Sequence, residues 1–213
     1  MENNQNEFDN KAKTWDTQPD RAHRSQVIAE AICDAIPHNP SFTAMEYGCG
    51  TGLLSFPIKD RFSKITLIDN SQGMLDVLRE KIKAENATNM DVLNIDLLES
   101  SAGLSNKFSV IYNSMVLHHI VDVNKIMSIW YSLLTAPGYL CVADLDSDGG
   151  LFHGKEFKGH NGFDRVDLEK IATETGFINV NFTTVYEIKK TGNDGVERTF
   201  PLFLMVAEKP KTI

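Results

Sequence analysis

EYGCGTG, residues 46–52, is the stretch that decides the fold. Gly48, Gly50 and Gly52 stand at alternate positions directly after residues 42–47, an apolar segment typical of a buried strand. Glycines at the end of a strand let the backbone pass close to a ligand, because they carry no Cβ atom. The stretch therefore predicts a ligand-binding turn after the first strand.

Outward from this turn, short apolar runs alternate with segments of helical periodicity. A turn is predicted at Pro137 and Gly138, and a loop is predicted over residues 144–162. TGNDG at 191–195 predicts the turn of a hairpin. Such an order is typical of an α/β fold with a parallel sheet covered on both faces. We predict a Rossmann-like, seven-stranded, mostly parallel sheet that ends in a C-terminal antiparallel hairpin. The predicted strands are residues 42–47, 64–68, 90–95, 108–112, 139–143, 180–188 and 199–207, and the predicted helices are about 20–36, 53–60, 74–86, 123–134 and 164–175.

Helix boundary signals are clearest near the end of the chain. Asp164 is placed to cap the last predicted helix, and Gly176 is placed to end it. The first 13 residues are polar and are expected to be frayed.

Composition narrows the class of protein. The chain has 213 residues, a net charge of −8 and a pI near 5.2, which argue against broad contact with a nucleic-acid backbone. No apolar run approaches the roughly 20 residues of a membrane span, and the polar N-terminus does not resemble a secretory signal. Three widely spaced cysteines suit a reducing cytoplasm better than a disulfide framework. We expect a single cytoplasmic domain, monomeric or homodimeric.

The glycine pattern excludes two common ligand classes. A dinucleotide fingerprint needs a glycine where Leu53 stands, and a phosphate-binding P-loop needs a lysine that is missing here. An acidic residue, Glu46, followed by three alternating glycines instead resembles the first motif of the class I S-adenosylmethionine-dependent methyltransferases. Three glycines suit this cofactor, because its methionine arm and ribose lie against bare backbone.

Other segments carry the same resemblance at matching positions. Asp69 ends the second predicted strand, Asp96 the third, and Leu117-His118-His119 follows the fourth. FDNKAKTWD at 8–16 resembles the opening helix of the small-molecule branch, which includes quinone-biosynthesis enzymes. The motifs cover about residues 7–145.

The resemblance implies S-adenosylmethionine as cofactor and S-adenosylhomocysteine as product. The three glycines would hold the methionine arm, Asp69 the ribose hydroxyls and Asp96 the adenine. Trp15 is either an aromatic lid or a hydrophobic staple. The cofactor-binding residues that the resemblance implies are Trp15, Glu46, Gly48, Gly50, Gly52, Asp69, Asn70, Met74, Asp96, Leu97 and Asn113.

The resemblance also divides the chain into a helical cap (1–40), a cofactor-binding core (41–146) and a substrate loop, helix and hairpin (147–213).

Four of the six histidines fall where the carboxyl ends of the strands meet. His118 and His119 follow the fourth strand, and His153 and His160 lie in the loop after the fifth. One or two of these are expected to act as base or substrate ligand, and the others to be packed or solvated.

The methyl acceptor is argued by exclusion. Residues 113–116, Asn-Ser-Met-Val, lack the two prolines typical of enzymes that methylate adenine or glutamine amino groups, and no cysteine follows a proline. We therefore expect a small-molecule acceptor. A non-catalytic cofactor-binding module and a protein or RNA methyltransferase remain the alternatives.

The loop after the fifth strand begins like a calcium loop. Asp144, Asp146, Asp148 and Gly149 fit the pattern, but the glutamate it needs falls at Lys155. A transition-metal site with His153 and His160 stays open as an alternative. We expect no metal and a mobile loop that closes over the substrate.

Overall fold

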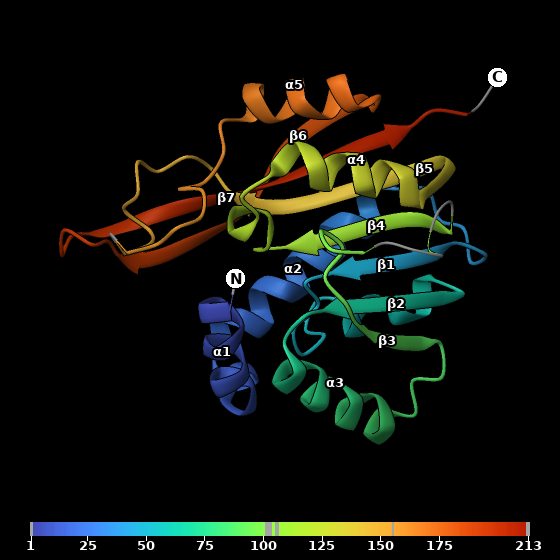
Figure 1. Cartoon of the computed structure of the whole chain (residues 1–213), viewed down its shortest axis with the longest axis horizontal. Coiled ribbons are helices and arrows are strands. Elements are labelled where there is room, and N and C mark those ends of the chain that lie inside the picture. The colour runs from blue at the N-terminus through green and yellow to red at the C-terminus, as the bar shows by residue number, and fades with distance from the viewer. Residues whose placement is uncertain (1, 101–103, 105–106, 155, 212–213) are drawn as a thin grey trace.

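The computed structural model describes residues 2–100, 104, 107–154 and 156–211. Figure 1 shows one sheet with helices on both sides. In chain order the elements are α1 (Glu2–Lys11), the 3-10 helix η1 (Ala12–Thr17), α2 (Pro19–Ala35), β1 (Thr43–Tyr47), the 3-10 helix η2 (Phe56–Arg61), β2 (Lys64–Asp69), α3 (Gln72–Glu85), β3 (Met90–Asn94), β4 (Phe108–Ser114), the 3-10 turn η3 (Leu117–His119), α4 (Val123–Leu133), β5 (Leu134–Leu145), α5 (Arg165–Thr175), β6 (Ile178–Thr191) and β7 (Glu197–Lys209).

The seven strands form one sheet in the order β3-β2-β1-β4-β5-β7-β6. The first five pair in parallel, and β7 pairs antiparallel with both β5 and β6. The predicted fold class, with its antiparallel hairpin, is confirmed. The chain reverses its direction of travel across the sheet between β1 and β4, and ligands bind at the carboxyl ends of strands beside such a switch point.

Two apolar cores sandwich the sheet. Ala44 of β1 belongs to the core with Ile28 and Ile32 of α2, whereas its neighbour Met45 packs in the core with Trp130 of α4. Side chains alternate between the faces of a strand, so β1 must be apolar on both sides. This explains why the central strands read as nearly continuous apolar runs.

The cap signals near the C-terminus are confirmed. The Asp164 carboxylate accepts hydrogen bonds from the amides of Val166 and Asp167 at the start of α5. Gly176 ends this helix with a left-handed φ of 112°. Ser71, rather than Asp69, caps α3 by accepting from the Met74 amide.

Three local predictions were wrong. Residues 2–11 form α1 instead of a frayed end, because α1 docks on α3. Residues 53–55 form turns, and the helix that follows them is the short 3-10 helix η2 instead of the predicted helix over 53–60. The left-handed backbone of Gly52 prevents a regular α-helix from starting directly after the glycines. Pro137 and Gly138 do not form a separate turn. They lie within β5, at the point where its pairing with β4 shifts register.

One end of the sheet gathers the segments on which function depends. Figure 1 shows α1, the orange loop that follows β5, and the β6–β7 hairpin beyond the carboxyl end of β4. Hydrogen bonds from Phe163 N to Leu145 O and from Ser147 N to Phe163 O close the base of that loop. None of the helices in the described ranges is long and apolar enough to cross a membrane.

Candidate active site

The three glycines of the first motif all have left-handed backbones, with φ of 68°, 52° and 81° at Gly48, Gly50 and Gly52. They differ in what a Cβ atom would meet. At Gly48 it would lie 2.5 Å from Val116, and at Gly52 2.7 Å from Leu78. At Gly50 the nearest atom is Met74 Sδ at 4.0 Å. Two glycines therefore serve packing within the protein, and Gly50 leaves the space that a cofactor needs.

Asp69 ties the second strand to the glycine turn. Its Oδ2 accepts from the Gly50 amide at 2.7 Å, and its Oδ1 accepts from the Ser71 amide at 2.8 Å. Burial raises the pKa of this carboxyl, and the amide hydrogen bonds oppose that shift. Each oxygen keeps further acceptor capacity for a ligand hydroxyl.

The other expected cofactor residues surround this point. Asn70 follows Asp69 directly, the Met74 side chain is buried next to Gly50, and Leu97 is buried after β3. Asp96 accepts from the Leu98 amide at 2.8 Å. These residues come from the ends of β2 and β3 and the start of α3.

Glu46 is hydrogen-bonded within the core. Its carboxyl accepts from the Ser55 hydroxyl, which is 2.6 Å from the Tyr112 hydroxyl, and all three side chains are buried. Burial raises the pKa of Glu46 to about 8. The charge of Asp69 raises this pKa further, and Glu46 braces the turn after the glycines from inside the core.

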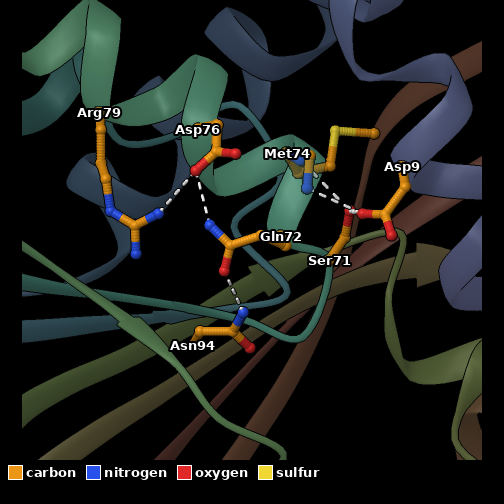
Figure 2. Close-up of polar contacts among 8 residues, drawn as sticks. Asp9, Ser71, Gln72, Met74, Asp76, Arg79 and Asn94 are labelled. Atoms are coloured by element: carbon orange, nitrogen blue, oxygen red, sulfur yellow. Dashed lines mark hydrogen bonds and ion pairs between the residues drawn. The ribbon is translucent and has the colours of Figure 1, made fainter.

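A helical cap covers the glycine turn and the start of α3. Figure 2 shows Asp9 of α1, whose Oδ1 accepts from the Ser71 hydroxyl at 2.6 Å. The same oxygen accepts from the Gly73 amide at 2.8 Å. Further along, Asp16 accepts from the Thr51 hydroxyl at 2.5 Å. The cap is thus attached to two segments of the expected cofactor site.

Trp15 packs inside this cap. The Arg21 guanidinium lies 3.8 Å from the centroid of its ring, and the Phe8 ring meets it edge-on at 5.7 Å. These contacts connect η1 with α1 and α2.

Three histidines meet at the carboxyl end of β4. The His118 and His119 rings are 4.2 Å apart, and His153 lies 4.9 Å from His118. The His118 Nδ1 atom is 2.7 Å from Asp144 Oδ1, and both side chains are buried. Phe157 stacks on His153 at 3.8 Å, so the loop after β5 reaches this cluster. We call His118, His119 and His153 the histidine cluster.

The cap and the loop meet over the histidine cluster. Phe8 of α1 lies 5.6 Å from His119, edge to face, and Phe157 lies 5.4 Å from the same ring. Val116, which lies against Gly48 of the glycine turn, is two residues before His118 in the sequence. Val116 and the cap therefore connect the expected cofactor residues with the possible catalytic groups.

Part of the chain is similar in sequence to known proteins. Residues 45–140 match the family model of a methyltransferase domain. An uncharacterized methyltransferase of Schizosaccharomyces pombe is 35% identical over 116 residues, covering 52% of this chain and 41% of the relative. A ubiquinone biosynthesis O-methyltransferase of Bartonella tribocorum is 28% identical over 130 residues, covering 58% and 52%. The chain thus spans about half the length of these curated relatives.

Solved structures agree with the sequence relatives. Phosphoethanolamine N-methyltransferase 2 of Haemonchus contortus, solved with S-adenosylmethionine, superposes with a TM-score of 0.70 at 16% identity, covering 96% of this chain and 60% of that one. Residues 45–140 are therefore similar to a methyltransferase domain, and the solved structure has the same fold as this chain.

Two members of the histidine cluster are held neutral. Burial, with the neighbouring His118, lowers the pKa of His119 to about 3. Burial and His118 likewise lower the pKa of His153 to about 4. His119 Nδ1 and His153 Nε2 are buried without a hydrogen-bond partner among the described residues. Neutral imidazoles with unpaired nitrogens are suited to hydrogen-bond a substrate.

His160 is not part of the cluster. Its Nε2 atom is 2.9 Å from the Ile120 carbonyl oxygen, and its amide donates to the His118 carbonyl at 2.8 Å. His160 therefore fastens the loop to η3, and its ring nitrogen is engaged with backbone. Within the described ranges, no group of three or more His, Cys, Asp or Glu residues is arranged to hold a metal ion.

Asn113 belongs to the same edge of the sheet. It is fully buried near the end of β4, and both its amide oxygen and its amide nitrogen lack partners in the part of the chain that the structure describes. A buried, unpaired amide is costly, so a bound ligand or water is expected to satisfy it.

Several residues of the site were missed from sequence. Asp9 and Asp16 were quoted only as part of the segment at residues 8–16, and Asp144 was considered only as part of a calcium pattern. Its position at the end of a buried apolar strand was the signal that it is buried, and a buried carboxylate needs a partner. Phe157 carries no signal, because only the path of the loop brings it to His153.

Proposed function

We propose that this methyltransferase transfers the methyl group of S-adenosylmethionine to a small-molecule acceptor, with His118 taking the acceptor's proton. The observation that carries the proposal is the buried pair of His118 and Asp144 beside the glycine turn. An ionised carboxylate can only accept, so it holds the proton on His118 Nδ1 and leaves Nε2 as the basic nitrogen.

The chemistry is an in-line displacement. The acceptor's lone pair attacks the methyl carbon, the carbon–sulfur bond breaks, and its electron pair remains on the sulfur of S-adenosylhomocysteine. The acceptor's proton passes to His118. The protein aligns the two reactants and excludes water, which the cap and the loop over the histidine cluster support.

The proposed division of labour follows the chain. Residues 41–146 bind the donor, residues 1–40 form the cap, and residues 147–213 supply the substrate loop and the hairpin. Within the core, Gly50, Asp69 and Asp96 are the main proposed cofactor contacts. A small acceptor is supported by the acidic chain and by the enclosed histidine cluster, and the ubiquinone-pathway relative acts on such a molecule by its name. The three free thiols favour a reducing compartment, and we propose the cytoplasm.

The test separates binding from catalysis. S-adenosylhomocysteine should raise the melting temperature, because it binds the folded state. Radiolabelled methyl transfer is then measured on a panel of phenols, catechols, thiols and amines. Wild type and the control His38→Gln, an exposed histidine outside the cluster, should be equally active on the same acceptor, and His118→Gln should be inactive. Binding without transfer to any acceptor class would favour a non-catalytic module.

A further inference from the structure

Arg24, in the second turn of α2, is a cation without a partner. It is half-buried, and no hydrogen bond or ion pair joins it to another residue of the described ranges. Burial lowers the pKa of its guanidinium, and the nearby positive charge of Arg21 lowers it further. A charge withdrawn from water is normally paired, so its isolation in the unliganded protein indicates a ligand.

The surroundings of Arg24 favour an anion. Arg21 lies one helical turn away, and Lys190 of β6 lies on the hairpin strand against which α2 packs. Tyr186, also on β6, interacts electrostatically with Arg24, and its hydroxyl is 3.2 Å from His23 Nδ1. Two neighbouring arginines on one helix, in a chain of net charge −8, favour a negatively charged ligand at this point.

The carboxylates nearby are either engaged or peripheral. Asp16 pairs with Lys81 at 2.8 Å, and Asp148 accepts from the amides of Gly150 and Phe152. Asp20, on the first turn of α2, is exposed; its charge partly opposes the lowering of the Arg24 pKa, but no ion pair joins the two among the described residues. None of them neutralises the guanidinium within the described structure.

Successive contacts connect this cation with the histidine cluster. Arg21 covers Trp15, Trp15 meets Phe8, and Phe8 meets His119, with ring contacts of 3.8, 5.7 and 5.6 Å. On the opposite side, Lys190 lies 4.1 Å from the Phe152 ring, which in turn lies 4.9 Å from His153. The start of α2 and the hairpin thus border the same end of the sheet as the cluster (Figure 1).

We infer that Arg24 binds an anionic group, a carboxylate or a phosphate, of the methyl acceptor. The guanidinium presents a planar fork of donors that matches either group in two parallel hydrogen bonds. The anion would anchor one end of the acceptor at α2 and direct its nucleophile toward His118. This inference rests on the proposed function and adds the class of substrate.

The experiment uses the full chain saturated with S-adenosylhomocysteine, with cofactor binding verified first by its own titration. Benzoate, phenyl phosphate and the neutral analogue benzamide are then titrated by calorimetry into wild type and Arg24→Gln. At least one anion should bind wild type at least tenfold more tightly than benzamide does, and Arg24→Gln should abolish that preference. Whichever anion is preferred assigns carboxylate or phosphate. Arg79→Gln, which removes an exposed arginine of α3 paired with Asp76, is the control of equal charge change and should keep the preference.

A second measurement separates ligand binding from a structural role. Removing an unpaired, half-buried charge should leave the melting temperature of the unliganded protein unchanged or higher in Arg24→Gln. Equal binding of benzamide and both anions to wild type, or a large fall in that melting temperature, would overturn the inference. If S-adenosylhomocysteine itself fails to bind, the proposed function fails instead.

Discussion

His118 and Asp144, 26 positions apart in sequence, form a hydrogen bond of 2.7 Å in which the carboxylate also accepts from the His118 amide. The carboxylate thus fixes both the ring and the backbone of the same residue. Asp144→Asn should lower the rate of methyl transfer roughly 100-fold or more, because the amide no longer fixes the tautomer or stabilises the imidazolium. Affinity for S-adenosylhomocysteine should stay within about twofold, since Asp144 is not an expected cofactor contact. Single-turnover rates and cofactor titrations check the two parts, and an unchanged rate would remove His118 as base.

The neutral histidines predict a loss of stability in mild acid. The folded-state pKa of His119, about 3, lies below its ordinary value of 6.5, so the unfolded chain binds a proton that the folded protein excludes. Stability is therefore present above pH 6.5 and lost as the pH falls toward 3, at up to about 1.4 kcal/mol per pH unit for one group. Urea unfolding of His119→Gln between pH 6.5 and 4.5 should show a shallower slope than wild type. Parallel curves would contradict a neutral His119.

The buried Glu46 carboxyl should make stability change with pH in the opposite direction. Its folded-state pKa of about 8 lies above 4.5, so the folded protein keeps a proton that the unfolded chain releases. The stability this gives is fully present below pH 4.5 and is lost as the pH rises toward 8. Glu46→Gln should therefore melt at a higher temperature than wild type at pH 8, with little difference at pH 4.5. The exposed Glu197→Gln is the control. Unchanged cofactor affinity in Glu46→Gln would show that Glu46 acts through the core and makes no contact with the cofactor.

Substitutions of two glycines should separate cofactor binding from folding. Gly50→Ala adds a methyl group into open space, at a cost of about 1–2 kcal/mol for the left-handed backbone, and should weaken S-adenosylhomocysteine binding strongly. Gly52→Ala has the same backbone cost and also meets Leu78 at 2.7 Å, so its larger effect should be on the melting temperature. A Gly50→Ala variant with full affinity would place the cofactor elsewhere.

The cap should open when its carboxylate is removed. Asp9→Ala loses the hydrogen bonds to Ser71 and Gly73, and hydrogen exchange should increase across residues 8–17. Asp9→Asn keeps an acceptor oxygen and should be intermediate. Gly73→Ala offers an independent route, because its Cβ would lie 3.0 Å from the Asp9 backbone, so that α1 must shift by a few tenths of an ångström. Faster release of S-adenosylhomocysteine from the Asp9→Ala and Gly73→Ala variants would follow, whereas exchange equal to wild type would show that the cap does not depend on this contact.

Much of the fold was predictable because local signals and tertiary structure agree. The buried strands read as apolar runs, and Asp164 and Gly176 bound α5 where their side-chain chemistry predicts. Glu46 could also have been placed from sequence. It shares the face of β1 with Ala44, opposite Met45 and Tyr47, so strand alternation alone directs it into the core.

The remaining features depend on contacts between distant residues. Helix α1 is polar apart from Phe8. It is ordered against the start of α3, through the hydrogen bond between Asp9 and Ser71, which are 62 positions apart. His153 and His160 share one loop, yet one faces the cluster and the other bonds the backbone. Their spacing carries no information about this difference, because the path of the loop is set by Phe157 packing and by main-chain hydrogen bonds.

The attachment of the β5 loop to the hairpin has a consequence for engineering. Lys190 donates to the Phe152 carbonyl at 2.6 Å, and the Asn193 amide donates to the Leu151 carbonyl at 3.1 Å. Loop and hairpin therefore behave as one transplantable unit, contributed by the C-terminal third of the chain. Chimeras that exchange residues 147–213 as a block should change acceptor choice while leaving donor recognition intact, whereas exchange of the loop alone would break both anchors.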